Sequence, residues 1–286
     1  MLKLQVQTEC LNNSIFIIDG LKDDDLQTAN RLYDDISVHA KHSEISIHYG
    51  KVSTREELFK VLNEIKEYSK AGGYPIIHFE LHGSKKEGAC VGNGGENISW
   101  RDLVDVLRDI NVITRNNLGI VMAGCHGLYA LTEIDGQKPT PFNFFMGCED
   151  SIQAGVLQDN IAKFYHNLFE NYSLPEAMKA VKSEFVGFLA EKVFVESMVK
   201  YLRNQARGKG KNKRIENIVT KWVKLHPDHT KEELKKFRFD LKARLKPSIE
   251  EIQRNADIFL HGRYFVNPDD ILTYLETFKG PSMARK

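Results

Sequence analysis

Short apolar runs alternate with amphipathic stretches over the first 170 residues. Residues 14–19 (SIFIID) and 44–52 (EISIHYGKV) are typical of strands, and a helix is expected between them over 21–38. A Thr-x-x-Glu capping pattern predicts a second helix over 54–70. The apolar run at 74–81 (YPIIHFEL) predicts a third strand, so strands and helices follow one another regularly.

Two more apolar runs extend this pattern. Residues 118–123 (LGIVMA) and 141–148 (PFNFFMGC) predict a fourth and a fifth strand, and Ser99 is expected to cap the helix before the fourth. The third and fourth runs are almost wholly apolar, as strands buried on both faces require. Because helices separate the strands, the sequence predicts βαβ crossovers and an α/β three-layer sandwich with a mostly parallel sheet.

Beyond about residue 170 the pattern becomes helical, and no further strand is expected. The helices are expected at 151–171, 174–205, 215–225, 230–245 and 269–278. Residues 205–214 (QARGKGKNKR) are basic, contain glycine and lack apolar periodicity, which is typical of a linker. The predicted domains are an α/β domain at 1–204, a basic linker at 205–214 and a C-terminal helical extension at 215–286.

Composition and charge add two points to this picture. Hydrophobic residues make up 42% and charged residues 28%, which argues against a disordered or fibrous protein. No apolar stretch reaches the length of a membrane span, so a soluble, cytoplasmic protein without membrane contact is expected.

The net charge of +1 is the sum of two unlike parts. Residues 200–254 hold 17 Lys and Arg against 7 Asp and Glu, and the other residues carry a net charge of −9. Residues 200–254 are therefore a candidate surface for nucleic acid or an acidic protein, although solvated helix faces are the usual reason for Lys-rich stretches.

Four widely spaced cysteines without a CxxC pair indicate thiols rather than disulfides. Cys10 and Cys90 are expected to be inert, and Cys148 is expected to be buried at the end of the fifth strand. Cys125 differs from them because it follows the fourth strand directly and has Gly124 before it. It is the one cysteine for which the sequence predicts chemistry.

A histidine and a cysteine follow two neighbouring strands of the predicted sheet. His82 follows the third strand and Cys125 the fourth, each beside a glycine, and loops at the carboxyl ends of parallel strands converge on ligands. A thiol needs a base to become a nucleophile at neutral pH, and an imidazole can take its proton and later protonate a leaving amine. The N–H groups of Gly83 and Cys125 are candidate donors to an oxyanion. The pattern therefore predicts acyl transfer at Cys125.

Other polar residues near this pair have two interpretations each. His126 is a second candidate base, but adjacent side chains on an extended chain point oppositely, so it is expected at the cleft rim. Glu80 shares a strand side with His78 and His82, and it either orients His82 or makes a contact in the core. The GNGGEN stretch at 92–97 lacks a phosphate-loop pattern and is expected to border the substrate cleft.

The runs FELHGS at 79–84 and AGCHG at 123–127 resemble the caspase-like (clan CD) cysteine peptidases, whose His lies about 50 residues before the Cys. The caspase run Gln-Ala-Cys-Arg-Gly is replaced here, with Gly124 directly before Cys125 and His126 after it. This version is closer to the bacterial CHAT branch of the caspase-like peptidases. Residues 92–103 and 147–181 are also similar to that branch.

The resemblance implies a caspase-like sandwich and a cysteine endopeptidase, with Cys125 as nucleophile and His82 as general base and acid. It implies a protein substrate and neither a metal nor an organic cofactor. It also implies a regulated effector of bacterial antiviral defence or cell death, which an activating or regulatory protein partner controls. In several such families an acidic group after the fifth strand binds a basic substrate residue. Glu149 and Asp150 are the corresponding substrate-binding candidates, with capping of the next helix as the alternative.

Two further hypotheses concern the C-terminal part. Arg207, Lys209 and Lys213 make the predicted linker a candidate site of autoprocessing, since caspase-like enzymes commonly cut their own loops. The alternative to an active peptidase is a catalytically silent caspase-like module. Such a module would bind a protein or nucleic-acid partner through the basic C-terminal helices.

Overall fold

The computed structural model describes residues 11–181 and 185–277, which form two compact units. The sheet unit comprises the described residues up to 190 together with 258–263, and the helical unit comprises 191–257 and 264–277. This division differs from the expected one, which placed the first boundary at 204. Residues 208–214, expected in a linker, begin a helix.

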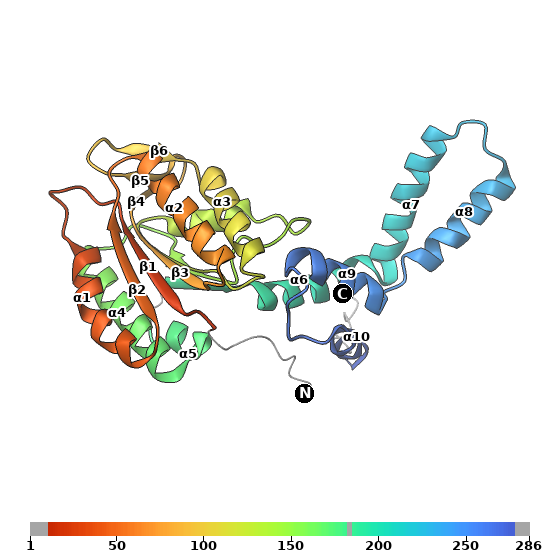
Figure 1. Ribbon diagram of the computed structural model, residues 1–286. Helices are drawn as coiled ribbons and strands as arrows, with labels where there is room; N and C mark the ends of the chain where they lie inside the picture. Colours follow the sequence, from red (N-terminus) through yellow and green to blue (C-terminus); the bar gives the residue numbers. More distant parts are fainter. Residues whose placement is uncertain (1–10, 182–184, 278–286) are drawn as a thin grey trace, which may run out of the picture. The chain divides into compact units, whose positions relative to one another are not determined.

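A six-stranded sheet forms the centre of the sheet unit, in the order β2-β1-β3-β7-β8-β9 (Figure 1). Neighbouring strands are parallel except for β9, which is antiparallel to β8. The strands are β1 (Ser14–Asp19), β2 (Ser46–Lys51), β3 (Pro75–Glu80), β7 (Gly119–Ala123), β8 (Phe144–Cys148) and β9 (Phe185–Leu189). The prediction of an α/β fold with a mostly parallel sheet is confirmed.

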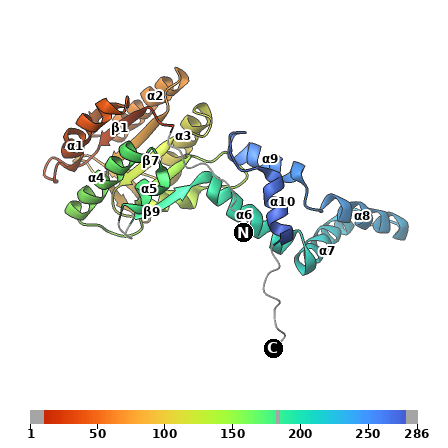
Figure 2. The same ribbon diagram turned by 90° about the horizontal axis from the view of Figure 1, so that it is seen from below.

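Helices cover both faces of this sheet and complete a three-layer sandwich (Figure 2). One face carries α1 (Thr28–His42), α4 (Ala154–Asn171) and α5 (Leu174–Lys179), and the other carries α2 (Arg55–Lys70) and α3 (Trp100–Ile113). Every residue of β3, β7 and β8 is buried, as their continuous apolar character requires. Strand β2 lies at the edge of the sheet and is mostly exposed, which agrees with its alternating pattern.

Side-chain caps fix where two of the helices begin. The Thr54 hydroxyl accepts a hydrogen bond from the Glu57 N–H (3.2 Å), and the Ser99 hydroxyl accepts one from the Asp102 N–H (3.1 Å). Both predicted caps are therefore confirmed. Helix α1 begins later than expected, at Thr28, and this leaves residues 20–27 as a loop at the end of β1.

Residues 82–98 form a second, antiparallel sheet of three short strands, where a loop was expected. These strands are β4 (His82–Ser84), β5 (Gly88–Val91) and β6 (Glu96–Ile98). Gly92 and Gly95 both have φ of 64° in the β5–β6 turn, a conformation that favours glycine. The glycines of GNGGEN therefore serve a hairpin turn, and residues 92–97 do not line the cleft described below.

The expectation of one helix over 174–205 and no further strand was wrong. Helix α5 ends at Lys179, and strand β9 then pairs with β8 and buries Phe185 and Phe188. Helix α6 (Ala190–Gln205) begins directly after that strand. Burial of the two phenylalanines against the sheet outweighs the helical character of the surrounding sequence.

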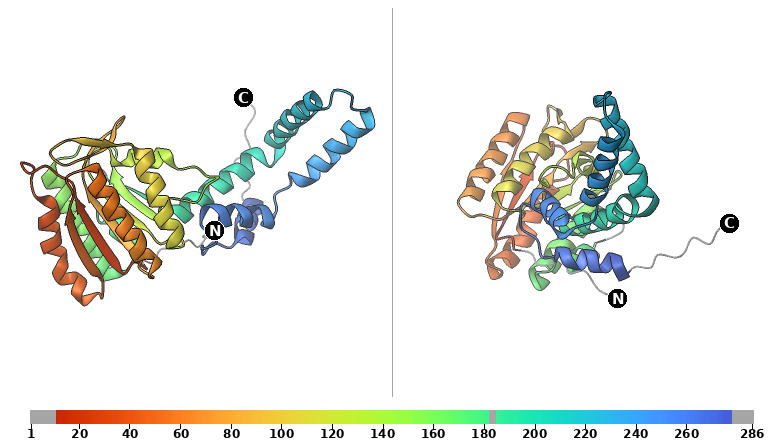
Figure 3. Two further views of the ribbon diagram at one scale, coloured as in Figure 1. Left: turned by 45° about the horizontal axis from the view of Figure 1, so that its top comes forward. Right: turned by 90° about the vertical axis from the view of Figure 1, so that its right-hand side faces the viewer.

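The helical unit contains α6, α7 (Gly208–Leu225), α8 (Lys231–Arg244), α9 (Ile249–Phe259), whose last two residues belong to the sheet unit, and α10 (Pro268–Thr277). Helix α9 was not expected. Helices α7 and α8 lie side by side as a hairpin with a small core of their own, made by Ile215, Val219 and Leu241 (Figure 3). Among the described residues, no helix combines the length and the apolar character needed to cross a bilayer.

Candidate active site

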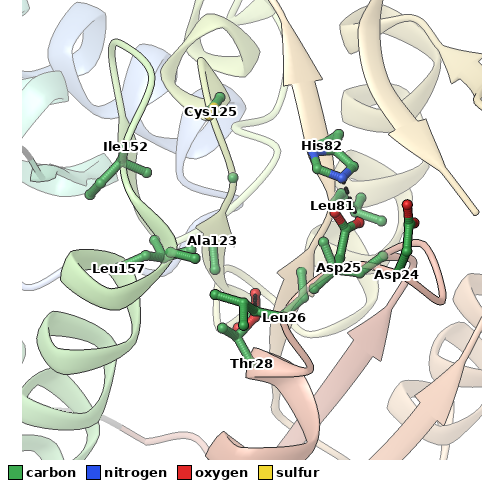
Figure 4. A pocket seen from close by; sticks show the side chains of 14 residues that line it. Asp24, Asp25, Leu26, Thr28, Leu81, His82, Ala123, Cys125, Ile152 and Leu157 are labelled. Carbon is green, nitrogen blue, oxygen red and sulfur yellow. Dashed lines mark hydrogen bonds and ion pairs between the residues drawn. The ribbon is translucent and has the colours of Figure 1, made fainter.

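A cleft of about 370 Å³ opens at the carboxyl ends of β1, β3 and β7, which are neighbours in the sheet (Figure 4). Asp19 pairs with Glu80, and Glu80 with Ala123, so the three strands end at the same level. The residues that follow them place Asp25, His82 and Cys125 in one cleft lining. The structure thus brings together the two residues that the sequence singled out, and adds a third.

Two glycines allow the segments that carry His82 and Cys125 to touch backbone to backbone. A Cβ added to Gly83 would lie under 3.0 Å from the Cys125 carbonyl oxygen, and one added to Gly124 would lie under 3.0 Å from the Leu81 carbonyl oxygen. Because both obstacles are backbone atoms, a side chain at either position would force the segments apart. This reciprocal contact fixes the backbone of His82 relative to that of Cys125.

Cys125 lies on a sharp turn between β7 and the short 3-10 helix η1 (Gly127–Glu133). The residue after it, His126, has φ 59° and ψ 17°, a left-handed conformation that is uncommon outside glycine. The His126 N–H donates to the Asp150 carbonyl oxygen (3.4 Å), which helps to hold the turn. As a result the Cys125 side chain is partly exposed at the cleft.

The His126 ring is turned away from the cleft. Its Nδ1 lies 2.9 Å from the Glu149 carbonyl oxygen, and its Nε2 lies 3.5 Å from the Ser151 hydroxyl. His126 does not line the cleft. This agrees with a place at the rim and gives no support to His126 as the base.

Asp25 is the partner of His82. Its Oδ2 lies 2.7 Å from His82 Nε2 and accepts a second hydrogen bond from the Lys22 N–H (2.8 Å). Partial burial alone would raise the pKa of Asp25, but these hydrogen bonds and the charge of His82 lower it overall. The carboxylate therefore stays ionised at neutral pH, and protonation breaks the pair only when the pH falls through the lowered pKa.

The hydrogen bond to Asp25 uses Nε2 of His82 and leaves Nδ1 as the nitrogen that can accept a proton. With Nε2 donating to the carboxylate, Nδ1 carries the lone pair, and Figure 4 shows it on the side of the ring toward Cys125. The His82 side chain is 46% exposed at the mouth of the cleft. Cys125 and His82 both line the cleft, but within the described residues no hydrogen bond joins the Cys125 thiol to His82.

Hydrogen bonds at and beside it hold the loop that carries Asp25. Asp19, fully buried at the end of β1, accepts a hydrogen bond from the Tyr49 hydroxyl (2.7 Å), and burial together with this bond raises the pKa of Tyr49. Asp23 accepts a hydrogen bond from the Asn93 side chain (2.6 Å) across the β5–β6 turn. Asp25 therefore belongs to an anchored loop, which favours a constant distance to His82.

The two residues proposed as oxyanion donors contact each other, but only Cys125 lines the cleft. Gly83 stands opposite Ala89 in the β4–β5 ladder and contacts the Cys125 carbonyl group. Within the described chain no backbone hydrogen bond uses the N–H of Cys125, so that group remains available to a ligand.

Glu80 makes a contact in the core and does not orient His82. Its carboxylate accepts a hydrogen bond from the Thr28 hydroxyl (3.0 Å) and lies 3.1 Å from His78 Nε2, while His78 Nδ1 lies 3.1 Å from the Tyr165 hydroxyl. Glu80 and Thr28 both line the cleft. A hydrogen-bonded carboxylate therefore lies at the bottom of the cleft.

The cleft combines negative charge with apolar walls. Three carboxylates, from Asp24, Asp25 and Glu80, contribute to its lining, and neither Lys nor Arg does so in the described chain. The apolar part of the lining comes from Leu21, Leu26, Leu81, Ile152, Leu157 and two alanines. Such a lining suits a side chain with an apolar stem and a positive end.

Glu149 and Asp150 are not part of this cleft. Asp150 is exposed and pairs with Lys85 (3.2 Å), a contact that raises the pKa of Lys85. Helix α4 begins at Ala154 with Gln153 at its N-cap, so neither acidic residue caps it. The structure thus gives neither the substrate contact nor the capping role that the sequence suggested for this pair.

Neither Cys90 nor Cys148 lines the cleft. Cys148 is buried in β8, as expected, and Cys90 is a partly exposed thiol in β5. Cys10 lies outside the described residues. In the part of the chain that the structure describes, no group of three or more His, Cys, Asp or Glu side chains is placed to hold a metal ion.

Sequence reasoning missed Asp25, although a signal was present. Three consecutive aspartates at 23–25 follow the first strand, and that strand neighbours the third in the sheet. Acidic residues at the carboxyl end of a strand next to the one that carries His82 were candidates for its partner. The late start of α1, which leaves 20–27 as a loop, is what makes the contact possible.

Fold and site together define an α/β three-layer protein with cysteine, histidine and aspartate at the ends of three neighbouring strands. A scan against models of known protein families gave no match, and no curated protein matches the chain.

Proposed function

We propose that the protein is a cysteine endopeptidase of the caspase-like kind, with Cys125 as nucleophile and His82 as general base and acid. The observation that carries this proposal is the convergence of Cys125, His82 and Asp25 on one cleft. The resemblance of FELHGS and AGCHG to the caspase-like peptidases supports the same chemistry.

The reaction follows from the roles of these groups. His82 takes the proton of the Cys125 thiol, and the sulfur attacks the carbonyl carbon of the scissile peptide bond. The C–N bond then breaks, and His82 gives its proton to the leaving amine, which leaves a thioester on Cys125. Water attacks the thioester after losing a proton to His82, and the acid product departs as the proton returns to the sulfur. The N–H groups of Cys125 and Gly83 are the proposed donors to the oxyanion of each tetrahedral intermediate.

Asp25 is a positioning residue in this scheme. It acts through His82, because it accepts a hydrogen bond from the Nε2–H group and so directs the Nδ1 lone pair toward the cleft. It also balances the positive charge that His82 gains when it takes the thiol proton.

Replacing Asp25 by Asn is expected to lower kcat for peptide hydrolysis by about 10-fold to 100-fold while KM changes little. The amide keeps the size of the side chain but loses the negative charge, and it can present a donor to Nε2, which favours the wrong tautomer of His82. The measurement is steady-state hydrolysis of a fluorogenic peptide across pH 5 to 9.

The control for this variant is Asp34→Asn, which removes the same charge from an exposed position on α1. Asp25→Glu, which restores the carboxylate, is expected to recover part of the lost rate. Equal rates for Asp25→Asn and wild-type enzyme at every pH would contradict the positioning role.

The lining of the cleft supports a preference for Arg or Lys before the scissile bond. A guanidinium or ammonium group can pair with the carboxylate of Asp24, and its methylene stem can pack on Leu26 and Leu157. An acidic substrate side chain would meet only like charge there. The residues of this lining replace Glu149 and Asp150 as the proposed contacts to a basic substrate side chain.

The proposal is tested by covalent labelling with a peptidyl acyloxymethyl ketone that carries Arg next to the reactive group. Wild-type protein is expected to gain one label by intact mass, and Cys125→Ala none, since the thiolate of Cys125 forms the bond. Cys90→Ala, which removes the other partly exposed thiol, is expected to label at the wild-type rate. The same reagent with Asp in place of Arg is expected to react at least 10-fold more slowly.

The outcomes separate the two parts of the proposal. Labelling that persists in Cys125→Ala, or no labelling by either reagent, would overturn the peptidase assignment. Faster reaction with the Asp reagent would overturn only the preference for a basic residue.

A wider role as a regulated effector of bacterial antiviral defence or cell death, with a protein activator, is supported by the resemblance alone. The second candidate function is partner binding by a catalytically silent module. One observation favours a binding role for the helical unit, whether or not the cleft is active. This observation is a basic face of α8 on which, within the described residues, three of four cations have no carboxylate partner.

A further inference from the structure

A groove of about 370 Å³ runs along helix α8 in the helical unit. The residues that line it are Lys231, Leu234, Lys235, Arg238, Phe239 and Lys242. They recur every three or four positions, so they share one face of the helix. At 1.5 Å of rise per residue the four cations span about 16 Å along the axis, with successive cations about 5 to 6 Å apart.

The chain provides little negative charge to this face. The three acidic residues of α8 do not line the groove, and one of them, Glu233, is occupied in the capping box with Thr230. Among the described residues only Arg238 of the four cations has a carboxylate partner, Glu216 at 2.8 Å. Even so, Nε of Arg238 is buried without a hydrogen-bond partner in the described structure. The groove thus holds more positive charge and more donors than the helical unit satisfies.

Helix α7 adds a further cation at one end of the same helix. The Lys211 ammonium group donates to the Lys242 carbonyl oxygen (3.1 Å). Burial, and then the positive charges of Lys246 and Lys242, lower the pKa of Lys211. Like charges are therefore crowded here, and a bound anion would relieve their repulsion.

The groove also presents an aromatic ring to solvent. Phe239 is 73% exposed among the cations and is not part of the hairpin core, whereas Leu234 both lines the groove and packs against that core. Sites for single-stranded nucleic acid combine these two features, a basic groove for the phosphates and an aromatic side chain on which a base stacks. A duplex keeps its base faces covered, and the carboxylate side chains of an acidic protein have no ring that could stack on Phe239.

We infer that this face of α8 binds single-stranded nucleic acid, with the phosphates along the four cations and a base stacked on Phe239. The inference does not depend on the peptidase activity of the cleft. It assigns to the helical unit a ligand of its own.

The test is fluorescence anisotropy with the full chain and a labelled, mixed-sequence DNA strand of about 20 nucleotides, over a series of salt concentrations. With four phosphate contacts at about 0.7 each, the slope of log K against log [salt] is expected near −3. The groove variant Lys231→Gln/Lys235→Gln/Lys242→Gln is expected to flatten this slope by about 2 and to bind at least 10-fold more weakly. Phe239→Ala is expected to weaken binding by about 5-fold or more, whereas Phe239→Trp retains it.

The matched control is Lys221→Gln/Lys224→Gln/Lys236→Gln, which removes the same charge from exposed positions outside the groove. It is expected to bind within about threefold of wild type, and circular dichroism verifies that both triple variants keep their helix content. The inference is overturned if wild type does not bind at low salt, or if both triple variants lose affinity equally. It is also overturned if the matching duplex binds as tightly as the single strand, or if polyglutamate displaces the strand at equal charge concentration, since the latter would indicate an acidic protein as the ligand.

Discussion

Replacing His82 by alanine is expected to lower kcat/KM for hydrolysis of an Arg-containing fluorogenic peptide by about 10²-fold to 10⁴-fold. His82 is the only imidazole among the residues that line the cleft, and its Nε2 is held by Asp25 at 2.7 Å. Without it, the Cys125 thiol loses the group that takes its proton, and the leaving amine loses its acid. Because water replaces both functions poorly, most of the loss is expected in kcat.

The chain offers a matched control for this experiment. His126 is adjacent to Cys125 in sequence, but its ring contacts the Glu149 carbonyl group outside the cleft. His126→Ala is expected to keep kcat/KM within about threefold of wild type. A larger loss in His126→Ala than in His82→Ala would reverse the assignment of the base.

Replacing Gly124 by alanine is expected to remove activity and to destabilise the sheet unit together. The added Cβ would lie under 3.0 Å from the Leu81 carbonyl oxygen, and neither backbone segment can move without displacing His82 or Cys125. Overpacking of this kind costs about 1 to 3 kcal/mol. In a unit of this size the corresponding fall in Tm is about 3 to 10 °C, measurable by differential scanning fluorimetry.

Gly136→Ala is the control for this substitution, since a Cβ at Gly136 meets nothing within 4 Å and its φ lies outside the left-handed region. It is expected to leave both Tm and labelling of Cys125 at their wild-type values. If Gly124→Ala also kept both, the backbone contact between the two segments would not be what orders the site.

Much of the fold was predictable because the sheet is buried on both faces. Continuous apolar runs fall on β3, β7 and β8, and the capping residues Thr54 and Ser99 mark where α2 and α3 begin. Strand β9 was missed because its five residues include Gly187 and only two phenylalanines are well buried. Its conformation depends on pairing with β8, which lies about 40 residues earlier in the chain.

The candidate site was predictable only in part, for a similar reason. His82 and Cys125 follow apolar strands beside glycines, and this local pattern can be read directly from the sequence. The contact between Asp25 and His82 joins residues 57 positions apart and depends on where α1 begins. The basic face of α8 was visible as charge density, but its separation from the acidic residues of the helix required the helix bounds.

The return of residues 258–263 to the sheet unit determines how the protein behaves when its chain is cut. Thr140 is fully buried, and its N–H donates to the Phe259 carbonyl oxygen (2.8 Å). A shortened protein that stops at residue 204 would lack this acceptor, and an orphaned buried N–H costs about 1 to 3 kcal/mol. A nick between α7 and α8 leaves both parts of the sheet unit present, the residues up to 190 in one fragment and 258–263 in the other. The two fragments are then expected to stay associated through contacts such as the one between Thr140 and Phe259.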